Sequence, residues 1–368
     1  MTEERPHNEV ANVTVRGGIK MMTDPGKLKI DMLEVPDNPE EIYNIFYERG
    51  WTDGLPIIPP TKERVTRMLH GTRKDPSEVL GSLPPFGNDA TVSHVAVNAV
   101  MAGCLPEYMP VLVTAVQALA EPSLGLHNIQ ATTHPVAPLV IVNGPIRHRI
   151  GMNCGCNLFG PANRANATIG RAVRLMLLNI GGGLPGTYDL STHGQPSKYS
   201  FCIAENEEEN PWEPLHVEMG FDKTDSVVTV NGVENPHNIN DHTADDAENL
   251  LVTYAASIAT QGNNNILYQS GEPLLIPGPE HARILANSGY SKTQLKEYMY
   301  RKARIPKKAY SRKHQEMQFA AYGEDDLIPV IRSPQALMVV VAGGAGKHTL
   351  FCPNYAIRTG AVTKRIEE

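Results

Sequence analysis

The segment PLVIVNGPIRHRIGMNCGCNLFGPANRANATIGRAVRLMLLNIGGGLPGTYDLSTHGQ (Pro138–Gln195) combines the clearest strand pattern of the chain with its densest group of reactive residues. PLVIVNGP (Pro138–Pro145) is a continuous β-branched run, typical of a strand covered on both faces. Ala165–Ile180 is expected to form a helix between loops rich in glycine and asparagine. Ligands in open α/β sheets bind beyond the carboxyl ends of strands. We therefore expect Asn143–Gln195 to form the floor of an active site.

Two further apolar runs, PLLIPG (Pro273–Gly278) and ALMVVVAGGAGKHT (Ala336–Thr349), also indicate buried strands. Three such strands alternating with helices predict an α/β fold with a largely parallel sheet, flanking helices and connecting loops rich in proline and glycine. The Asn-Gly pair within TDSVVTVNGVE (Thr224–Glu234) predicts a hairpin turn. No internal repeat is evident.

The length of 368 residues allows one large domain or two ordinary ones. We expect residues 1–40 to be a polar N-terminal arm in which Lys27–Val35 forms one strand. Residues 41–220 are expected to form a first α/β region that carries the Asn/Gly/Cys site. Residues 221–368 would form a second α/β region with the C-terminal glycine loop, as a second, smaller domain.

Two helix starts are signalled by capping residues. Asn38 precedes a proline and two glutamates, which predicts a helix from Pro39 to about Glu48. Thr61 is placed to cap a second helix, Lys62–Leu69.

The bulk composition is that of a globular protein, with 41% hydrophobic and 20% charged residues. A net charge of -7 argues against a nucleic-acid partner. No run of about 18 apolar residues is present, which argues against a membrane partner. The N-terminus MTEERPHNEV has no apolar signal region, and five cysteines show no disulfide framework. We therefore expect a cytoplasmic protein with free thiols.

Cys154-Gly155-Cys156 places two thiols two residues apart. Together they could bind a soft metal or form a redox couple, and catalytic thiol chemistry is one reading. With nitrogen ligands from His148 and His134, the set would suit zinc, iron or copper, although the spacing matches no standard zinc motif. The alternative is a pair of small buried residues in a glycine-rich turn.

Amide and guanidinium groups cluster around the start of the expected helix: Asn153, Asn157, Asn163, Arg164, Asn166 and Arg171. Backbone N–H groups at a helix start, together with such side chains, favour a bound carboxylate or phosphate. The alternative is that the asparagines satisfy loop backbone groups.

The loop GGGLPGTYDLSTHG (Gly181–Gly194) offers three candidate proton-transfer groups, Tyr188, Asp189 and His193. A histidine near a carboxylate is a common general acid/base pair. The alternative is an ordinary surface loop. Asp53, in GWTDGLP, is expected to serve a structural turn.

The loop AGGAGKH (Ala342–His348) follows a buried strand, as phosphate-binding loops do. Val341 stands where the Walker pattern has glycine, and the residue after Lys347 is histidine instead of serine or threonine. The dinucleotide pattern fails at Thr349, so no NAD, FAD or ATP fingerprint is intact. What remains is a set of backbone N–H groups with Lys347 and His348 that could hold an anion. The alternative is a tight structural turn.

Five phrases carry a family resemblance: GWTDGLPIIPP, VAVNAVMAGCLPEYMPV, RANATIGRA, IAENEEENPWEPLH and PEHARILANSGYSK. From about Glu48 to its end, the chain resembles an uncharacterised bacterial family associated with UGSC-motif (seleno)proteins. The resemblance implies a link to thiol redox chemistry and a UGSC-type protein partner. The chain contains no CGSC segment, and Cys154-Gly155-Cys156-Asn157 differs from that motif.

These observations predict an enzyme that acts on a small anionic substrate, carboxylate or phosphate-like, by metal- or thiol-assisted chemistry. A lyase or hydrolase is favoured over an oxidoreductase because no nucleotide or flavin fingerprint is intact. One alternative is a non-catalytic or activating subunit of a thiol-redox complex. Another is a nucleotide- or phosphate-binding protein that uses the AGGAGKH loop. The chain is expected to form a homo-oligomer, or a hetero-oligomer with the UGSC-type partner.

Overall fold

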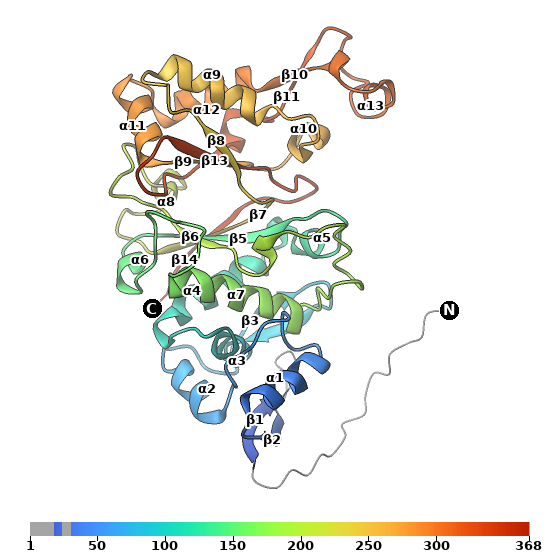
Figure 1. Ribbon diagram of the computed structural model, residues 1–368, viewed down its shortest axis with the longest axis vertical. Helices are drawn as coiled ribbons and strands as arrows, with labels where there is room; N and C mark the ends of the chain where they lie inside the picture. Colours follow the sequence, from blue (N-terminus) through green and yellow to red (C-terminus); the bar gives the residue numbers. More distant parts are fainter. Residues whose placement is uncertain (1–17, 24–30, 368) are drawn as a thin grey trace.

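The structure, a computed structural model, describes residues 18–23 and 31–367. Four layers are stacked along the long axis of the molecule: helices, a sheet, a second sheet and helices again (Figure 1). The mixed α/β content of the prediction is confirmed. Of the strand expected over Lys27–Val35, β2 (Asp31–Pro36) is present, and residues 27–30 lie outside the described residues.

The first sheet has the strand order β14-β7-β5-β6. β5 (Ala137–Asn143) pairs in parallel with β6 (Cys202–Ala204). On its other side β5 pairs antiparallel with β7 (Val227–Val233), which pairs antiparallel with β14 (Val362–Arg365). This sheet therefore contains one parallel and two antiparallel pairings.

The second sheet has the order β12-β9-β13-β8. β9 (Leu274–Pro277) pairs in parallel with β12 (Met338–Val339) and antiparallel with β13 (His348–Cys352). β13 pairs antiparallel with β8 (His237–Asn240). A largely parallel sheet is thus not confirmed, because antiparallel pairings outnumber parallel ones in both sheets.

The two sheets repeat one another in pairing order, although the sequence shows no evident repeat. Each sheet also contributes a strand to the other along the chain. β8 follows β7 of the first sheet and joins the second, and β14 follows β13 of the second sheet and joins the first. The sheets consequently do not divide at residue 220, since β7 and β14 both belong to the first sheet. In each sheet a short helix precedes an interior strand along the chain. α5 (Leu126–Gln130) precedes β5, and α10 (Asn264–Tyr268) precedes β9.

The hairpin predicted at Asn231-Gly232 is wrong, because β7 continues straight through both residues. The side chain of Asn231 is fully buried and donates to the carbonyl oxygen of Glu272. Its oxygen accepts a hydrogen bond from Asn354. These tertiary partners override the local turn preference of the dipeptide.

Buried side chains form three hydrophobic cores, because those of each strand point alternately to the two faces of its sheet. Leu139 and Ile141 of β5 pack between the two sheets with Leu274 and Ile276 of β9. Val140, on the opposite face of β5, packs in the core beneath the first sheet. Side chains of a strand alternate between faces, so one buried strand serves two cores. The predicted strand is confirmed as buried on both faces from Pro138 to Asn143, where β5 ends; Pro145 lies outside it and is exposed.

Helices α4 (Met109–Leu119) and α7 (Arg164–Asn179) cover the first sheet, and α3 (Val92–Ala102) packs against both of these helices (Figure 1). Helices α9 (Ala247–Ile258) and α11 (Pro279–Asn287) cover the second sheet, and α12 (Lys292–Lys302) packs against α9. The two predicted caps are confirmed: Asn38 accepts hydrogen bonds at the start of α1 (Pro39–Glu48), and Thr61 does so for α2 (Lys62–Leu69).

The other β-strands and α-helices of the described chain are shorter. They are β1 (Gly18–Thr23), β3 (Val79–Leu83), β4 (Asn88–Thr91), α6 (Ile146–Arg149), α8 (Leu215–Glu218), β10 (Arg304–Pro306), α13 (Arg312–Met317) and β11 (Leu327–Pro329). Within the part of the chain that the structure describes, no helix has both the length and the apolar character needed to cross a membrane.

Candidate functional site

The asparagines at the start of α7 bind the protein itself. Asn163 caps the helix by accepting from the backbone N–H of Asn166, and its amide donates to the carbonyl oxygen of Gly151. Asn166 bonds both the N–H and the carbonyl oxygen of Asn153. The side chain of Asn153 in turn bonds the backbone of Gly155 and Cys156. This end of the helix is a closed network of loop and cap contacts.

The other predicted anion ligands on this segment also face protein acceptors. Asn157 donates to the carbonyl oxygen of Pro161, and Arg164 donates twice to that of Gly103. Arg171 forms a two-point ion pair with Asp53, with contacts of 2.8 and 2.9 Å. Asp53 is therefore structural, as its turn sequence predicts, but it also anchors α7.

The thiols lie on the loop that precedes α7. Cys154 is half-buried, and burial raises the pKa of its thiol, against the opposing effect of Arg147. Cys156 is exposed. His148 lies 2.8 Å from the carboxylate of Glu208, whose pKa is held at about 2 chiefly by hydrogen bonds from Arg147. The imidazole of His148 is thus bound to a carboxylate.

The four predicted metal ligands do not form one set. His134 lies before β5 and Cys154 lies after it, so the seven-residue strand separates them by roughly 20 Å. His134 instead contacts Glu234 at 3.0 Å. Among residues 18–23 and 31–367, no group of three or more His, Cys, Asp or Glu side chains is arranged to hold a metal ion.

The AGGAGKH loop packs on the thiol loop. A Cβ added to Gly344 would lie 2.7 Å from the Cα of Cys156, so only glycine fits this approach. Lys347 donates to the carbonyl oxygens of His242 and Ala244, and the ring of His348 lies against that of His242. The predicted anion-holding groups of this loop are tied to neighbouring segments.

A buried carboxylate joins the ends of β5 and β6. Glu205 is fully buried, and burial raises the pKa of its carboxyl group. It accepts from Asn143, Asn210 and the N–H of Leu215. These donors satisfy its oxygens, so Glu205 connects the strand ends to the following loop.

A cavity of about 840 Å³ lies at the other end of α7, between that helix, the turn around Asp53 and the loop Leu184–Tyr199. We call it the charged cavity. Two predicted proton-transfer residues, Asp189 and His193, line it. Tyr188 is not among the lining residues; its ring packs edge-on against Phe86. Neither Cys154 nor Cys156 lines the cavity.

Arg174 lines this cavity and has no counterion in contact. The residue is 8% exposed. Its guanidinium makes no hydrogen bond or ion pair to any residue in the described ranges. A buried arginine without partners is rare, because removing its charge from water is costly unless a partner compensates.

The helical repeat explains how Arg174 reaches the cavity. Gly170 lies one turn earlier on the same face of α7, and a Cβ there would approach the backbone of Phe201 to 2.5 Å. The glycine lets the helix lie directly against the segment before β6. Arg174 is thereby placed near Lys198, which also lines the cavity.

The remaining charges of the cavity compensate each other. Asp189 pairs with Lys198 at 2.6 Å, and Asp53 pairs with Arg171. Only the charge of Arg174 lacks a contact partner among the described residues. The charges at the cavity therefore sum to one positive charge in excess.

The pKa shifts of the two cations agree with this arrangement. Burial lowers the pKa of Arg174, and the more distant carboxylates of Asp189 and Asp53 act in the opposite direction. Burial also lowers the pKa of Lys198; Asp189 opposes this shift, and Arg174 adds to it. An anion bound between the two cations would be stabilised by both.

Arg174 and Lys198 were missed by the sequence interpretation. The signal available for Arg174 was an arginine within the apolar run Val173–Leu178 of a helix. A charge on a buried helical face needs a partner or a ligand. Lys198 carried no comparable signal, because its position depends on the fold of the preceding loop.

No protein-family model, curated protein or solved structure matches this chain.

Proposed function

We propose that the charged cavity binds a small anionic molecule and that Arg174 holds its carboxylate or phosphate group. The observation that carries this proposal is the unpartnered guanidinium of Arg174 at the cavity wall. Arginine presents two parallel N–H donors that match the oxygens of a carboxylate or phosphate. Binding would compensate a charge that the protein leaves unpaired.

The proposed chemistry is proton transfer in a lyase- or hydrolase-type reaction. His193 lines the cavity beside the Asp189–Lys198 pair. Histidine is the side chain used most often as a general acid or base. Lys198 would add positive charge near the anion, while Asp189 keeps the ammonium group in place. The thiols of Cys154 and Cys156 take no part in the proposed chemistry, because they lie on a loop outside the cavity.

The proposal is tested by calorimetric titration with two probes, 4-phenylbutyrate and inorganic phosphate. The wild-type protein is expected to bind at least one of them. Arg174→Met keeps a long apolar side chain but removes the charge, so affinity should fall roughly 10- to 100-fold.

Arg164→Met is the matched control. It changes the net charge by the same amount on the same helix, and Arg164 lies outside both cavities with its guanidinium donating to the carbonyl oxygen of Gly103. Affinity in this variant should equal that of the wild type. Equal losses in both variants, or no binding of either probe by the wild type at about 10 mM, would contradict the proposal.

A further inference from the structure

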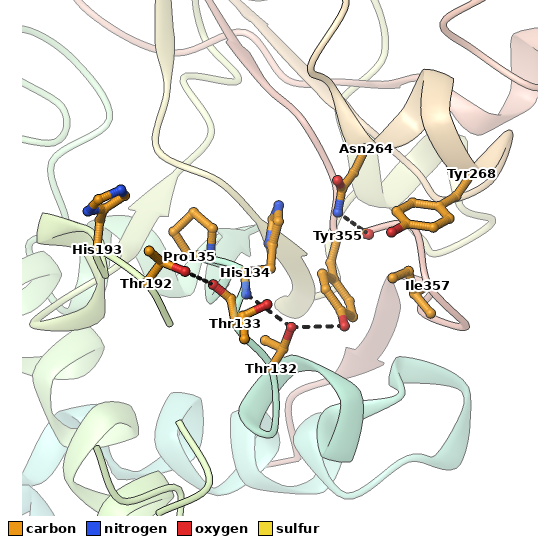
Figure 2. Close-up of a pocket in the computed structure, with 10 residues that line it drawn as sticks. All are labelled: Thr132, Thr133, His134, Pro135, Thr192, His193, Asn264, Tyr268, Tyr355 and Ile357. Carbon is orange, nitrogen blue, oxygen red and sulfur yellow. Dashed lines mark hydrogen bonds between the residues drawn. The ribbon is translucent and has the colours of Figure 1, made fainter. Parts of the chain in front are cut away.

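A second cavity, of about 620 Å³, adjoins the charged cavity. We call it the aromatic cavity. Figure 2 shows His134 and Tyr355 at its centre, Tyr268 and Asn264 on one side and His193 on the other. No Asp, Glu, Lys or Arg side chain of the described chain lines it. Its polarity comes from hydroxyl, amide and imidazole groups.

The aromatic cavity lies where the two halves of the fold meet. Next to it, the segments that leave β7 and β13 bond to each other, with the N–H of Glu234 donating to the carbonyl oxygen of Pro353 at 2.8 Å. Glu234 also contacts His134, and Tyr355 follows directly after this crossing. Ligand sites occur preferentially at such junctions, because side chains from separate units converge there.

The two cavities share a wall. Thr192 and His193 line both of them. The wall is fixed by backbone hydrogen bonds from Leu190 and Thr192 to the carbonyl oxygens of Thr132 and Thr133. Residues of one loop therefore face both cavities.

The aromatic cavity is suited to a flat, uncharged group. Tyr268 is 47% exposed, and its side chain makes no hydrogen bond to the residues that the structure describes. Tyr355 is held by a hydrogen bond from its hydroxyl to Thr132, and its ring packs against His134 with centroids 5.1 Å apart. Aromatic faces and edges prefer another planar ring, worth about 0.5–1.5 kcal/mol beyond area burial.

We propose that the two cavities form one bipartite site for an aromatic carboxylate. The carboxylate binds Arg174, the ring packs against Tyr268 and Tyr355, and His193 lies beside the atoms that connect them. This inference rests on the proposed function, which requires only that Arg174 binds an anion. It adds the class of substrate and a second group of binding residues.

The test compares 4-phenylbutyrate with 4-cyclohexylbutyrate by calorimetric titration. The two probes share the carboxylate and the chain length, and only one has a planar aromatic ring. Wild-type protein should bind the phenyl probe about tenfold more tightly. In Tyr268→Ala the two probes should bind with about equal affinity. Arg174→Met should weaken both probes and leave the preference in place.

Tyr47→Ala serves as the control, because Tyr47 is 60% exposed on α1 and lines neither cavity. The Tyr47→Ala variant should prefer 4-phenylbutyrate over 4-cyclohexylbutyrate as strongly as the wild type does. Equal binding of the two probes by the wild type, or an unchanged preference in Tyr268→Ala, overturns the bipartite site. Either result leaves the anion site intact if Arg174→Met still weakens carboxylate binding. Failure of 4-phenylbutyrate and 4-cyclohexylbutyrate to bind the wild type overturns the bipartite site. It overturns the anion site as well if inorganic phosphate also fails to bind.

Discussion

Arg171 and Arg174 lie three residues apart on α7 and have opposite surroundings. Arg171 has a two-point ion pair with Asp53 and also donates to the carbonyl oxygens of Leu55 and Pro56. Arg174 contacts no acceptor among the described residues, although it is the more buried of the two. The guanidinium of Arg171 is held by protein acceptors, and that of Arg174 has no contact partner among the described residues.

The same contrast separates the two ends of α7. At its start, amides and arginines that suggested an anion site are all used by the protein. Near its end, a single unpaired charge faces a cavity. The number of polar groups in a segment therefore says less about binding than whether each group already has a partner.

The largest expected effect is on stability, in Arg171→Met. The variant leaves the carboxylate of Asp53, whose side chain is 3% exposed, without its ion-pair partner. Loss of one member of a buried pair costs about 3–5 kcal/mol of the free energy of unfolding. Urea unfolding followed by circular dichroism measures this change.

Arg174→Met is compared with Arg171→Met by the same urea unfolding assay. It removes a buried charge that has no partner in contact, so stability should stay equal or rise. A loss in Arg174→Met as large as that in Arg171→Met would mean that both arginines are structural.

Asn166→Ala should have the next largest effect. The change removes two hydrogen bonds and leaves the partly buried N–H and carbonyl groups of Asn153 without these partners. The expected loss is about 2 kcal/mol of unfolding free energy. Affinity for 4-phenylbutyrate should be unchanged, as measured by calorimetric titration. A selective loss of affinity in a stable Asn166→Ala protein would restore the start of α7 as the anion site.

Local chemistry made part of the fold predictable. Asn38 and Thr61 cap helices as expected, because a cap needs only the backbone N–H groups two or three residues ahead. The direction of strand pairing was not predictable in this way. β7 joins β5 antiparallel and β14 arrives from the far end of the chain, and neither contact is encoded in a short window.

The sequence interpretation named two of the residues that line the charged cavity and missed its two cations. Asp189 and His193 line the charged cavity, as their loop sequence suggested. Arg174 becomes informative only after the fold shows that Asp189 pairs with Lys198, since that pairing leaves the arginine alone. A buried charge can be suspected from sequence, but the absence of its partner is a property of three-dimensional contacts.

A further prediction concerns the charge of Lys198 in the cavity. Asp189→Asn removes the partner of Lys198 and leaves its ammonium group beside Arg174. Affinity for 4-phenylbutyrate should rise about tenfold, equivalent to about 1.4 kcal/mol. The measurement is calorimetric titration at neutral pH and low salt, where charge effects are least screened. Weaker binding by this variant would place the anion away from the two cations.

The smallest expected effect is a pH dependence of binding. Burial lowers the pKa of Lys198, with Asp189 opposing, so its ammonium group loses its proton at a lower pH than an ordinary lysine. Once Lys198 is neutral, the carboxylate of Asp189 is uncompensated and opposes an anion held by Arg174. Affinity for 4-phenylbutyrate should therefore fall, by about threefold, as the pH rises from neutral toward the ordinary lysine value of about 10.4. Because the probe's carboxylate stays ionised throughout, the change in affinity reports the protein alone.

The control for this pH dependence is Lys198→Met, which should bind 4-phenylbutyrate more weakly at neutral pH and lose the dependence. A pH dependence that persists in Lys198→Met would show that another group controls the charge of the cavity.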